Sequence, residues 1–304
     1  MKITVTNEFD GKTVYNVLRA CGASGTLIKR IKTRPHGLSV DGVDVTVRAV
    51  VHTGNIISAD DADTFEDENE YVFPSDNISL DIIYEDDDVF VINKPSGMPT
   101  HTSHGHYTDT LANALCAEYR RRGQPFVFRP VNRLDSDTSG AVLLAKSKLA
   151  ACTLSRHMAS GNIKKTYIAV LEGELPLPCG ATERIVSYIR RRSDTIILRE
   201  SVPVEEAQDG DYAETVYTCL YKGHDLSIVS ATPVTGRTHQ LRVHFASIGH
   251  PITGDDMYGG SRELIGRQAL HAYTLGFPTA GGSITVKAPI PNDILKLIDS
   301  YIEL

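Results

Sequence analysis

The sequence lacks tryptophan and is poor in other aromatic residues, which make up 7% of its 304 positions. It also lacks a long apolar run. Ala141–Ala145 is among the longest, far short of the ~20 residues that a membrane-spanning helix needs. The first residues, MKITVTNEFDGKT, become polar after the sixth, too early for the apolar part of a secretory signal peptide. The lack of a long apolar run and of a signal-like N-terminal segment predicts a soluble, cytoplasmic protein with no membrane partner.

Cysteine is scarce as well, and the cysteines that are present lie far apart. No pair has the close spacing of a zinc knuckle or a redox motif, and their number is odd. We expect them to be reduced and mostly buried thiols, as in a cytosolic protein. The five are Cys21, Cys116, Cys152, Cys179 and Cys219.

The composition supports a packed core, with 41% hydrophobic and 23% charged residues, and excludes a disordered or fibrous chain. A chain of this length forms one large domain or, more often, two. The net charge of −7 argues against a nucleic-acid partner, but thirteen of the 38 acidic residues lie in residues 59–88, which contain no lysine or arginine. The rest of the chain has 31 basic and 25 acidic residues, and is therefore compatible with a polyanionic partner.

The acidic segment ADDADTFEDENEYVFPSD divides the sequence. Its composition predicts a solvated linker or an exposed loop. We therefore predict a small module at residues 1–58, an acidic linker at residues 59–76, and a larger domain at residues 77–304.

The small module combines two short helices with a hairpin. Helical spacing is present at residues 13–20 and 25–33, and the second helix has apolar residues on one side and lysine and arginine on the other. The pair Asp41-Gly42 between two alternating runs predicts a two-residue hairpin turn. This arrangement resembles the α-L type of RNA-binding domain of ribosomal proteins and RNA-modifying enzymes. The alternative is a small adaptor with a solvated basic face.

Strand and helix patterns are mixed in the larger domain, which predicts an α+β fold. We expect the helix at residues 109–122 to be capped by Asp109, and the helix at 238–248 to bury Leu241, Phe245 and Ile248. The other expected elements are a helix at 149–160 and strands at 80–84, 89–93, 141–145, 166–171, 195–198, 215–221 and 226–231.

The segment NRLDSDTSG, residues 132–140, places carboxylates in a polar loop just before a buried strand. A carboxylate at the rim of a rigid sheet is well placed to act as a nucleophile or a base. Asp135 and Asp137 could equally be loop caps that accept hydrogen bonds from nearby backbone groups. The residues alone leave both interpretations open.

Five segments in order along the chain resemble the motifs of the RluA-type RNA pseudouridine synthases. The segment NRLDSDTSG is similar to the HRLD-x-x-TSG loop of that family, with Asn132 where the family commonly has histidine. The others are VFVINKPSGMPTH, KKTYIAVLEG, TGRTHQLRVHFASIGHPITGDDMYG and LHAYTLGFP, which together span residues 89–278. Five matches in the family's order are far more specific than any single one.

This resemblance implies a mixed, largely antiparallel sheet with flanking helices and a central cleft, in which uridine of a structured RNA is isomerised without cofactor or metal. Asp135 then corresponds to the catalytic nucleophile, and Arg242 to the arginine that pairs with it and keeps it ionised. Tyr167 corresponds to the tyrosine that packs on the target base. Arg133 corresponds to the loop arginine, which fills the gap left by the extruded base or grips the adjacent phosphate.

The role of the family histidine is not transferred to Asn132.

We expect basic residues to contact the RNA phosphates, although each basic cluster could also be a solvent-exposed face without a partner. These are Lys164-Lys165, Arg190–Arg192, Arg237 and Arg120–Arg122. The histidines at 101, 104 and 106 have no matching cysteine or carboxylate set, which disfavours a metal site.

The predicted partner is RNA, with ribosomal RNA favoured and transfer RNA as the alternative, and the default oligomeric state is a monomer. A rival function is a catalytically inactive RNA-binding or ribosome-assembly factor on the same fold. Loss of Asp135, Tyr167 or Arg242 would favour that rival, and all three are present. A hydrolase with a carboxylate nucleophile would need a water-activating base or a metal beside Asp135, which the motifs do not supply.

Overall fold

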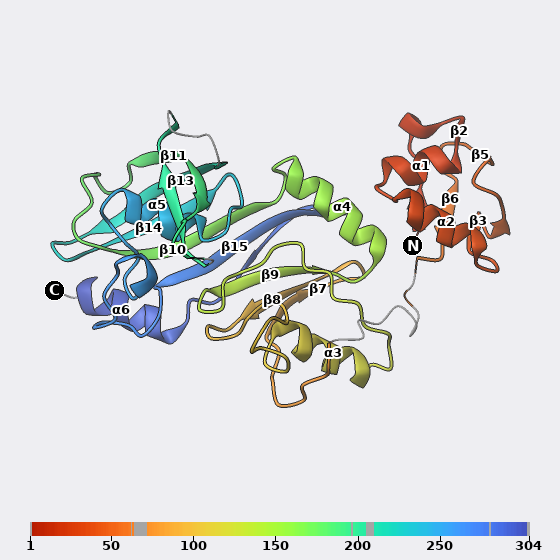
Figure 1. Ribbon diagram of the computed structural model, residues 1–304. Coiled ribbons are helices and arrows are strands. Elements are labelled where there is room, and N and C mark those ends of the chain that lie inside the picture. The colour runs from red at the N-terminus through yellow and green to blue at the C-terminus, as the bar shows by residue number, and fades with distance from the viewer. Residues whose placement is uncertain are drawn as a thin grey trace. The chain divides into compact units, whose positions relative to one another are not determined.

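The computed structural model (Figure 1) describes residues 2–61, 63, 72–195, 197–204, 210–279 and 281–302. The chain forms two compact units that interleave along the sequence. The first consists of Met1–Val91, Thr102–Arg133 and Leu143–Asn162, and the second of Ile92–His101, Leu134–Val142 and Ile163–Leu304. In the described part of the chain, no helix is both long and apolar enough to cross a membrane.

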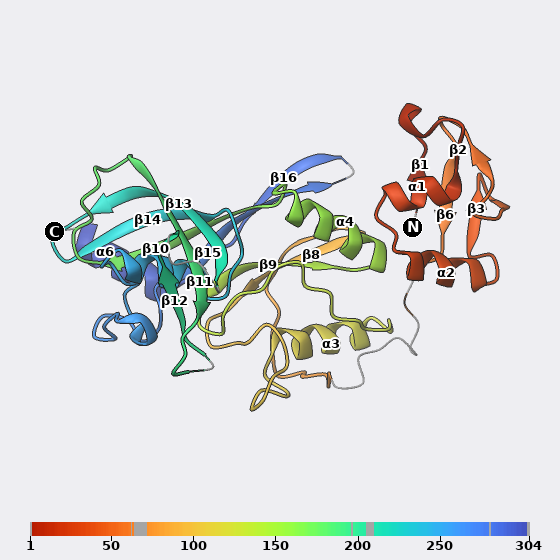
Figure 2. The same ribbon diagram turned by 45° about the horizontal axis from the view of Figure 1, so that its top comes forward.

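The N-terminal part of the first unit contains two helices and a four-stranded sheet, which lie together in Figure 2. These elements share an apolar core. Helix α1 (Val14–Ala20) and helix α2 (Gly25–Thr33) begin after Thr13 and Ser24, whose side chains accept hydrogen bonds from the first turns. The sheet has the order β1-β6-β3-β4, with β1 Lys2–Thr4, β6 Ile56–Ala59, β3 Leu38–Val40 and β4 Val43–Asp44; β2 Lys12–Thr13 pairs with β5 Val50–Val51.

Both predicted helices and the hairpin of this part are therefore present. The hairpin turns at Asp41 and Gly42, which have φ angles of 49° and 82°, as a two-residue turn of the type I′ class requires. The predicted linker at 59–76 lies largely outside the described residues, so the boundary there stays a prediction.

The rest of the first unit contains strand β7 (Ile82–Glu85), parts of strands β8 (Val89–Lys94) and β9 (Ser139–Ala145), and two helices. Strand β9 is buried along its whole length, as its apolar sequence predicts, and neighbours β8, which neighbours β7. Helix α3 (Leu111–Arg121) is capped by Thr110 rather than by the predicted Asp109. Thr110 forms a reciprocal capping box with Asn113, whereas Asp109 accepts a 2.6 Å hydrogen bond from His106. Helix α4 covers Lys148–Ala159.

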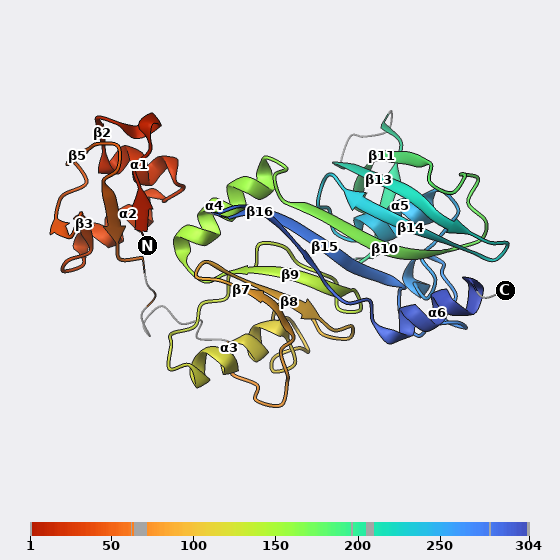
Figure 3. The same ribbon diagram turned by 180° about the vertical axis from the view of Figure 1, so that it is seen from behind.

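The second unit is built on antiparallel strands in the order β12-β11-β13-β14-β10-β15. Strand β16 pairs with β15 (Figure 3). The start of β9 joins β15 in parallel, through Ser139 and Gly140, so the sheet is mixed and largely antiparallel, as expected. The strands are β10 Lys164–Glu172, β11 Thr182–Arg191, β12 Arg199–Val202, β13 Asp211–Lys222, β14 Leu226–Pro233, β15 Leu270–Thr279 and β16 Gly282–Lys287.

Helix α5 (Gln240–Ser247) packs on the β11–β14 strands, where His244 hydrogen-bonds to Ser187 and Thr215. It starts two residues later than predicted because His239 has a left-handed backbone, and it ends at Ser247. Ile248 consequently follows the helix and is 37% exposed, so its predicted burial is wrong. The short 3-10 helix Asp256–Tyr258 and helix α6 (Asn292–Ile302) complete the unit.

Candidate active site

Asp135 and Arg242, 107 residues apart in the sequence, are in contact in the second unit. The Nη1 atom of Arg242 donates a 3.2 Å hydrogen bond to Oδ2 of Asp135. The Asp135 side chain is 31% exposed and the Arg242 side chain 5% exposed. The carboxylate is thus open to a reactant on one side and held by a buried cation on the other.

Arg242 is itself fixed by Asp255, which is almost fully buried. Its Nε and Nη2 atoms donate to the two carboxylate oxygens of Asp255 at 2.6 and 2.7 Å, a bidentate pair that leaves Nη1 for Asp135. The guanidinium also lies 5.0 Å from the ring centroid of Tyr258. Burial alone would lower the pKa of Arg242, but the two carboxylates outweigh it and raise the pKa above its ordinary value.

A glycine determines where Asp255 lies. Gly254 has a φ angle of 82°, and a Cβ atom there would come within 1.9 Å of the backbone oxygen of Arg267. Only glycine allows this close approach in a left-handed conformation. The segment GDDMYG, residues 254–259 at the end of one of the five family-like segments, therefore supplies both the backbone geometry and the carboxylate that orients Arg242. The sequence contained this segment, but it did not indicate a role for Asp255.

Tyr167 lies on strand β10. The register between β10 and β15 shifts between Thr166 and Tyr167, so that Tyr167 pairs with Ala272. Such a bulge changes the direction of a side chain relative to a regular strand. Tyr167 is 8% exposed. Burial and the charge of Asp135 raise the pKa of its hydroxyl well above the ordinary value, so the hydroxyl is protonated at neutral pH.

Lys94 is a buried cation that the sequence reasoning did not identify. Its ammonium donates to the backbone oxygens of Pro95, Met98 and Ser136 at 2.8, 2.6 and 2.8 Å. These bonds connect the NKPSG turn to the residue that follows Asp135. Burial lowers the pKa of Lys94 to about 7, against the opposing effect of the nearby aspartates.

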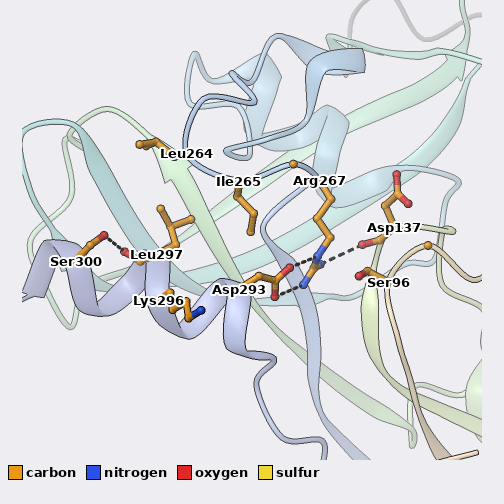
Figure 4. A pocket seen from close by; sticks show the side chains of 11 residues that line it. Ser96, Asp137, Leu264, Ile265, Arg267, Asp293, Lys296, Leu297 and Ser300 are labelled. Atoms are coloured by element: carbon orange, nitrogen blue, oxygen red, sulfur yellow. Dashed lines mark hydrogen bonds and ion pairs between the residues drawn. The ribbon is translucent and has the colours of Figure 1, made fainter.

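Asp137 contributes to a different site from Asp135. It lines a pocket of about 600 Å³ (Figure 4) together with residues that include Ser96, Arg267 and Lys296, whereas Asp135 does not line it. The backbone oxygen of Asp137 accepts a 3.1 Å hydrogen bond from Arg267, which also binds Asp293 through two nitrogen atoms at 2.7 and 2.9 Å. This contact fixes the loop at a second point, two residues after Asp135.

The first two residues of the motif loop, Asn132 and Arg133, belong to the first unit. The Arg133 side chain is exposed. Asn132 is buried, and its Oδ1 atom accepts a 2.8 Å hydrogen bond from the backbone N–H of Leu143 in β9. Asn132 therefore braces the backbone of its own unit. Of the four predicted site residues, Asp135, Tyr167 and Arg242 lie in the second unit and Arg133 lies in the first.

Several of the predicted phosphate-binding arginines make contacts within the protein. Arg122 pairs with Glu85 and Glu118, and Arg192 pairs with Asp194. The pair between Arg190 and Glu200 connects β11 and β12, and the Nε atom of Arg237 donates to a backbone oxygen. In the described ranges, no three histidine, cysteine, aspartate or glutamate side chains cluster as metal ligands would.

Comparison with known proteins identifies relatives of one kind. A family model described as RNA pseudouridylate synthase matches residues 88–247. YhcT of Bacillus subtilis, which is named as an uncharacterized RNA pseudouridine synthase, is 35% identical, over 99% of this chain and 97% of its own length. The ribosomal large subunit pseudouridine synthase D of Zymomonas mobilis is 35% identical, over 73% of this chain and 72% of its own. The solved structure of human RNA pseudouridylate synthase domain containing 1 superposes with a TM-score of 0.57 at 30% identity, covering 69% of this chain and 83% of that one.

Proposed function

Because the chain belongs to the RNA pseudouridylate synthase family and is an RNA pseudouridine synthase, we propose that Asp135 is its nucleophile and that its substrate is a uridine of ribosomal RNA. The observation that carries this proposal is the 3.2 Å hydrogen bond between Asp135 and a buried arginine that Asp255 holds in place. A nucleophilic carboxylate has to be ionised, and a fixed guanidinium in a partly desolvated site favours the ionised form.

The reaction is an isomerisation, so the enzyme needs no net oxidant or reductant. The bond between N1 of uracil and C1′ of ribose breaks, a bond between C5 and C1′ forms, and the proton lost from C5 is balanced by one gained at N1. Asp135 attacks either the ribose or the uracil ring, and both routes use the same ionised oxygen. Arg242 holds that oxygen in position throughout.

Tyr167 holds the target base in this proposal. A flat amphipathic ring packs well on uracil. Because the pKa of its hydroxyl is raised, Tyr167 acts at neutral pH as a hydrogen-bond donor rather than as a base.

A uridine within a folded RNA has to leave its stack to reach Asp135, at a cost of a few kcal/mol. Arg133, with its exposed side chain, is the proposed contact to the vacated position or the adjacent phosphate. We further propose that residues 1–58 bind RNA as an α-L-like module, that residues 59–76 link them to a catalytic domain at 77–304, and that the enzyme acts as a monomer.

Ribosomal RNA is the favoured target because a relative is named as a ribosomal large subunit pseudouridine synthase. Mapping pseudouridine in total RNA from cells with and without the gene tests this choice. Loss of one or a few sites in ribosomal RNA is the expected result. Loss of sites only in transfer RNA would overturn the proposed target and leave the nucleophile in place.

The nucleophile is tested by restoring the gene as wild type or as Asp135→Asn. The variant should fail to restore the lost sites, while its affinity for the same RNA changes less than about threefold, since only one oxygen is replaced. Asp137→Asn, two residues away in the same loop but on another pocket, is the matched control and should restore them. Restoration by Asp135→Asn would overturn the assignment of the nucleophile. Failure of the wild type itself to restore any site would instead favour the rival function of an RNA-binding factor.

A further inference from the structure

His239 has an unusual backbone conformation directly before α5. Its φ and ψ angles are 57° and 20°, in the left-handed region that non-glycine residues seldom adopt. Its side chain makes no capping hydrogen bond to the helix that it precedes. Strained residues of this kind cluster at functional sites, where the surrounding structure holds them for a purpose.

The imidazole of His239 lies between Asp135 and Tyr258. Its Nε2 atom is 3.8 Å from Oδ2 of Asp135, the same oxygen that Arg242 binds. Its Nδ1 atom is 2.8 Å from the hydroxyl of Tyr258. The His239 side chain is 13% exposed, so both nitrogen atoms face partners inside the site.

Tyr258 is fixed in turn by strand β12. Its hydroxyl oxygen accepts a 3.0 Å hydrogen bond from the backbone N–H of Arg199. That leaves the single hydroxyl proton free to be donated to Nδ1 of His239. A ring that accepts at Nδ1 and is neutral carries its own proton on Nε2, which is the nitrogen atom closest to Asp135.

The surroundings of His239 favour this neutral form. Burial lowers the pKa of His239 below its ordinary value, and the charge of Arg242 acts in the same direction. The charges of Asp135 and Asp255 oppose this without reversing it. A neutral ring can donate a hydrogen bond to Asp135 without adding a second positive charge beside Arg242.

We propose that His239 is a positioning residue that donates a second hydrogen bond to Asp135 from Nε2, and that Tyr258 sets the tautomer that makes this possible. The present 3.8 Å separation shortens to hydrogen-bond length when RNA is bound, because such contacts are often long in free enzymes. Two donors on one oxygen fix its direction better than Arg242 alone. This inference rests on the proposed role of Asp135, so its test includes a measurement that needs no activity.

That measurement is the tautomer of His239 in the uniformly ¹⁵N-labelled full-length protein, read from two-bond ¹H–¹⁵N correlations at neutral pH. The signal is assigned by its loss in His239→Gln. We expect the proton on Nε2 in the wild type, and a mixed or reversed tautomer in Tyr258→Phe, which keeps the ring beneath Arg242 but removes the hydroxyl. Tyr84→Phe removes a hydroxyl that is hydrogen-bonded to Asp86 in the first unit, and should leave the His239 signal unchanged. A wild-type proton on Nδ1 would overturn the proposal.

The second measurement is single-turnover release of tritium from large-subunit ribosomal RNA transcribed with [5-³H]uridine, with enzyme in excess. His239→Ala should slow release about 10- to 100-fold, as expected for loss of one donor to a charged group. His239→Gln retains an N–H donor and should recover most of that loss, and His224→Gln, on an exposed loop, should match the wild type. A rate for His239→Ala within twofold of the wild type would overturn the proposal. If the wild type itself releases no tritium, the proposed substrate fails, and the tautomer still decides the geometry.

Discussion

At the scale of single residues, the reactivity proposed for Asp135 depends on groups that bind its neighbours. Asp255 takes two nitrogen atoms of Arg242 and so leaves only Nη1 to face Asp135. Lys94 binds the backbone oxygen of Ser136, which fixes the peptide that follows Asp135. Neither Asp255 nor Lys94 has to touch the substrate for its loss to move the carboxylate.

The ammonium of Lys94 leads to a prediction about stability. Lys94→Met would leave three backbone oxygens without their donor, and we expect the free energy of unfolding to fall by about 2–4 kcal/mol. Urea unfolding followed by circular dichroism measures this change. Lys296→Met, on an exposed position of α6, is the matched control and should change stability by less than about 0.5 kcal/mol.

The same comparison has a defined pH dependence. The pKa of Lys94 is about 7 in the folded protein, below its ordinary value of 10.5, so between these pH values the unfolded chain binds a proton that the folded chain has released. The wild type should therefore gain stability relative to Lys94→Met as the pH rises from 7 to 9, by up to about 2 kcal/mol. An unchanged difference between the two pH values would show that Lys94 stays charged in the fold.

At the scale of elements, strand β9 directly follows the loop that carries Asp135 and anchors its end. Its first residues pair in parallel with β15, through Ser139 with His271 and Gly140 with Ala272. The Ser139 hydroxyl also hydrogen-bonds to Nδ1 of His271 at 2.9 Å, inside the core. The C-terminal end of the loop is therefore attached to the sheet by backbone pairing and by a buried side-chain hydrogen bond.

Gly140 is the residue at which this pairing can be tested. It has a φ angle of 115°, and a Cβ atom there would come within 2.3 Å of the backbone oxygen of Ala272. Gly140→Ala should therefore force β9 away from β15, lowering the free energy of unfolding by about 3 kcal/mol or more and abolishing activity. Gly161→Ala, with a φ angle of 70° but open space at the added atom, should cost only about 1 kcal/mol. Similar losses for both variants would mean that backbone strain, rather than the close approach, makes Gly140 necessary.

The elements that the sequence predicted are those with a strong local pattern. Strand β9, which is apolar from Gly140 to Ala145, could be predicted because a strand buried on both faces needs a continuous apolar run. Helix α2 could be predicted because a helix buried on one side needs apolar residues at helical spacing. The strand predicted at residues 195–198 is instead β12 at Arg199–Val202, and β11, β15, β16 and α6 were not predicted. Burial alternates along β11 and β16, but the residue types do not reveal it: in β11 Ser187 is buried and Val186 is exposed, and all residues of β16 are half-buried or exposed.

At the scale of the whole molecule, the candidate site consists of contacts between segments that are far apart in sequence. The Asp135–Arg242 pair spans 107 residues, and the Lys94–Ser136 bond spans 42. Motif resemblance predicted Asp135, Tyr167 and Arg242 because each lies in its own recognisable segment. It did not predict the roles of Lys94, Asp255 or His239, although all three lie within the same motifs. A motif gives the order of residues along the chain and does not show which of them are in contact in the fold.

Target binding, in contrast to chemistry, is proposed to depend on the N-terminal part of the chain. Helix α2 buries Leu27, Ile28 and Ile31 and leaves Lys29 and Lys32 exposed. If these lysines contact RNA phosphates, Lys29→Glu/Lys32→Glu should weaken RNA binding at least tenfold and reduce the slope of log affinity against log salt by about 2. The single-turnover rate at saturating enzyme should stay within about twofold of the wild type.

This last prediction separates a specific contact from a change in net charge. Lys222→Glu/Lys287→Glu makes the same charge change on the second unit, at the ends of β13 and β16. Filter binding of the same RNA between 50 and 300 mM salt, with both double variants, gives the two slopes directly. A loss confined to the α2 variant would support an RNA-binding module at residues 1–58. Equal losses would mean that RNA responds only to the total charge, and residues 1–58 would then have to serve as an adaptor instead.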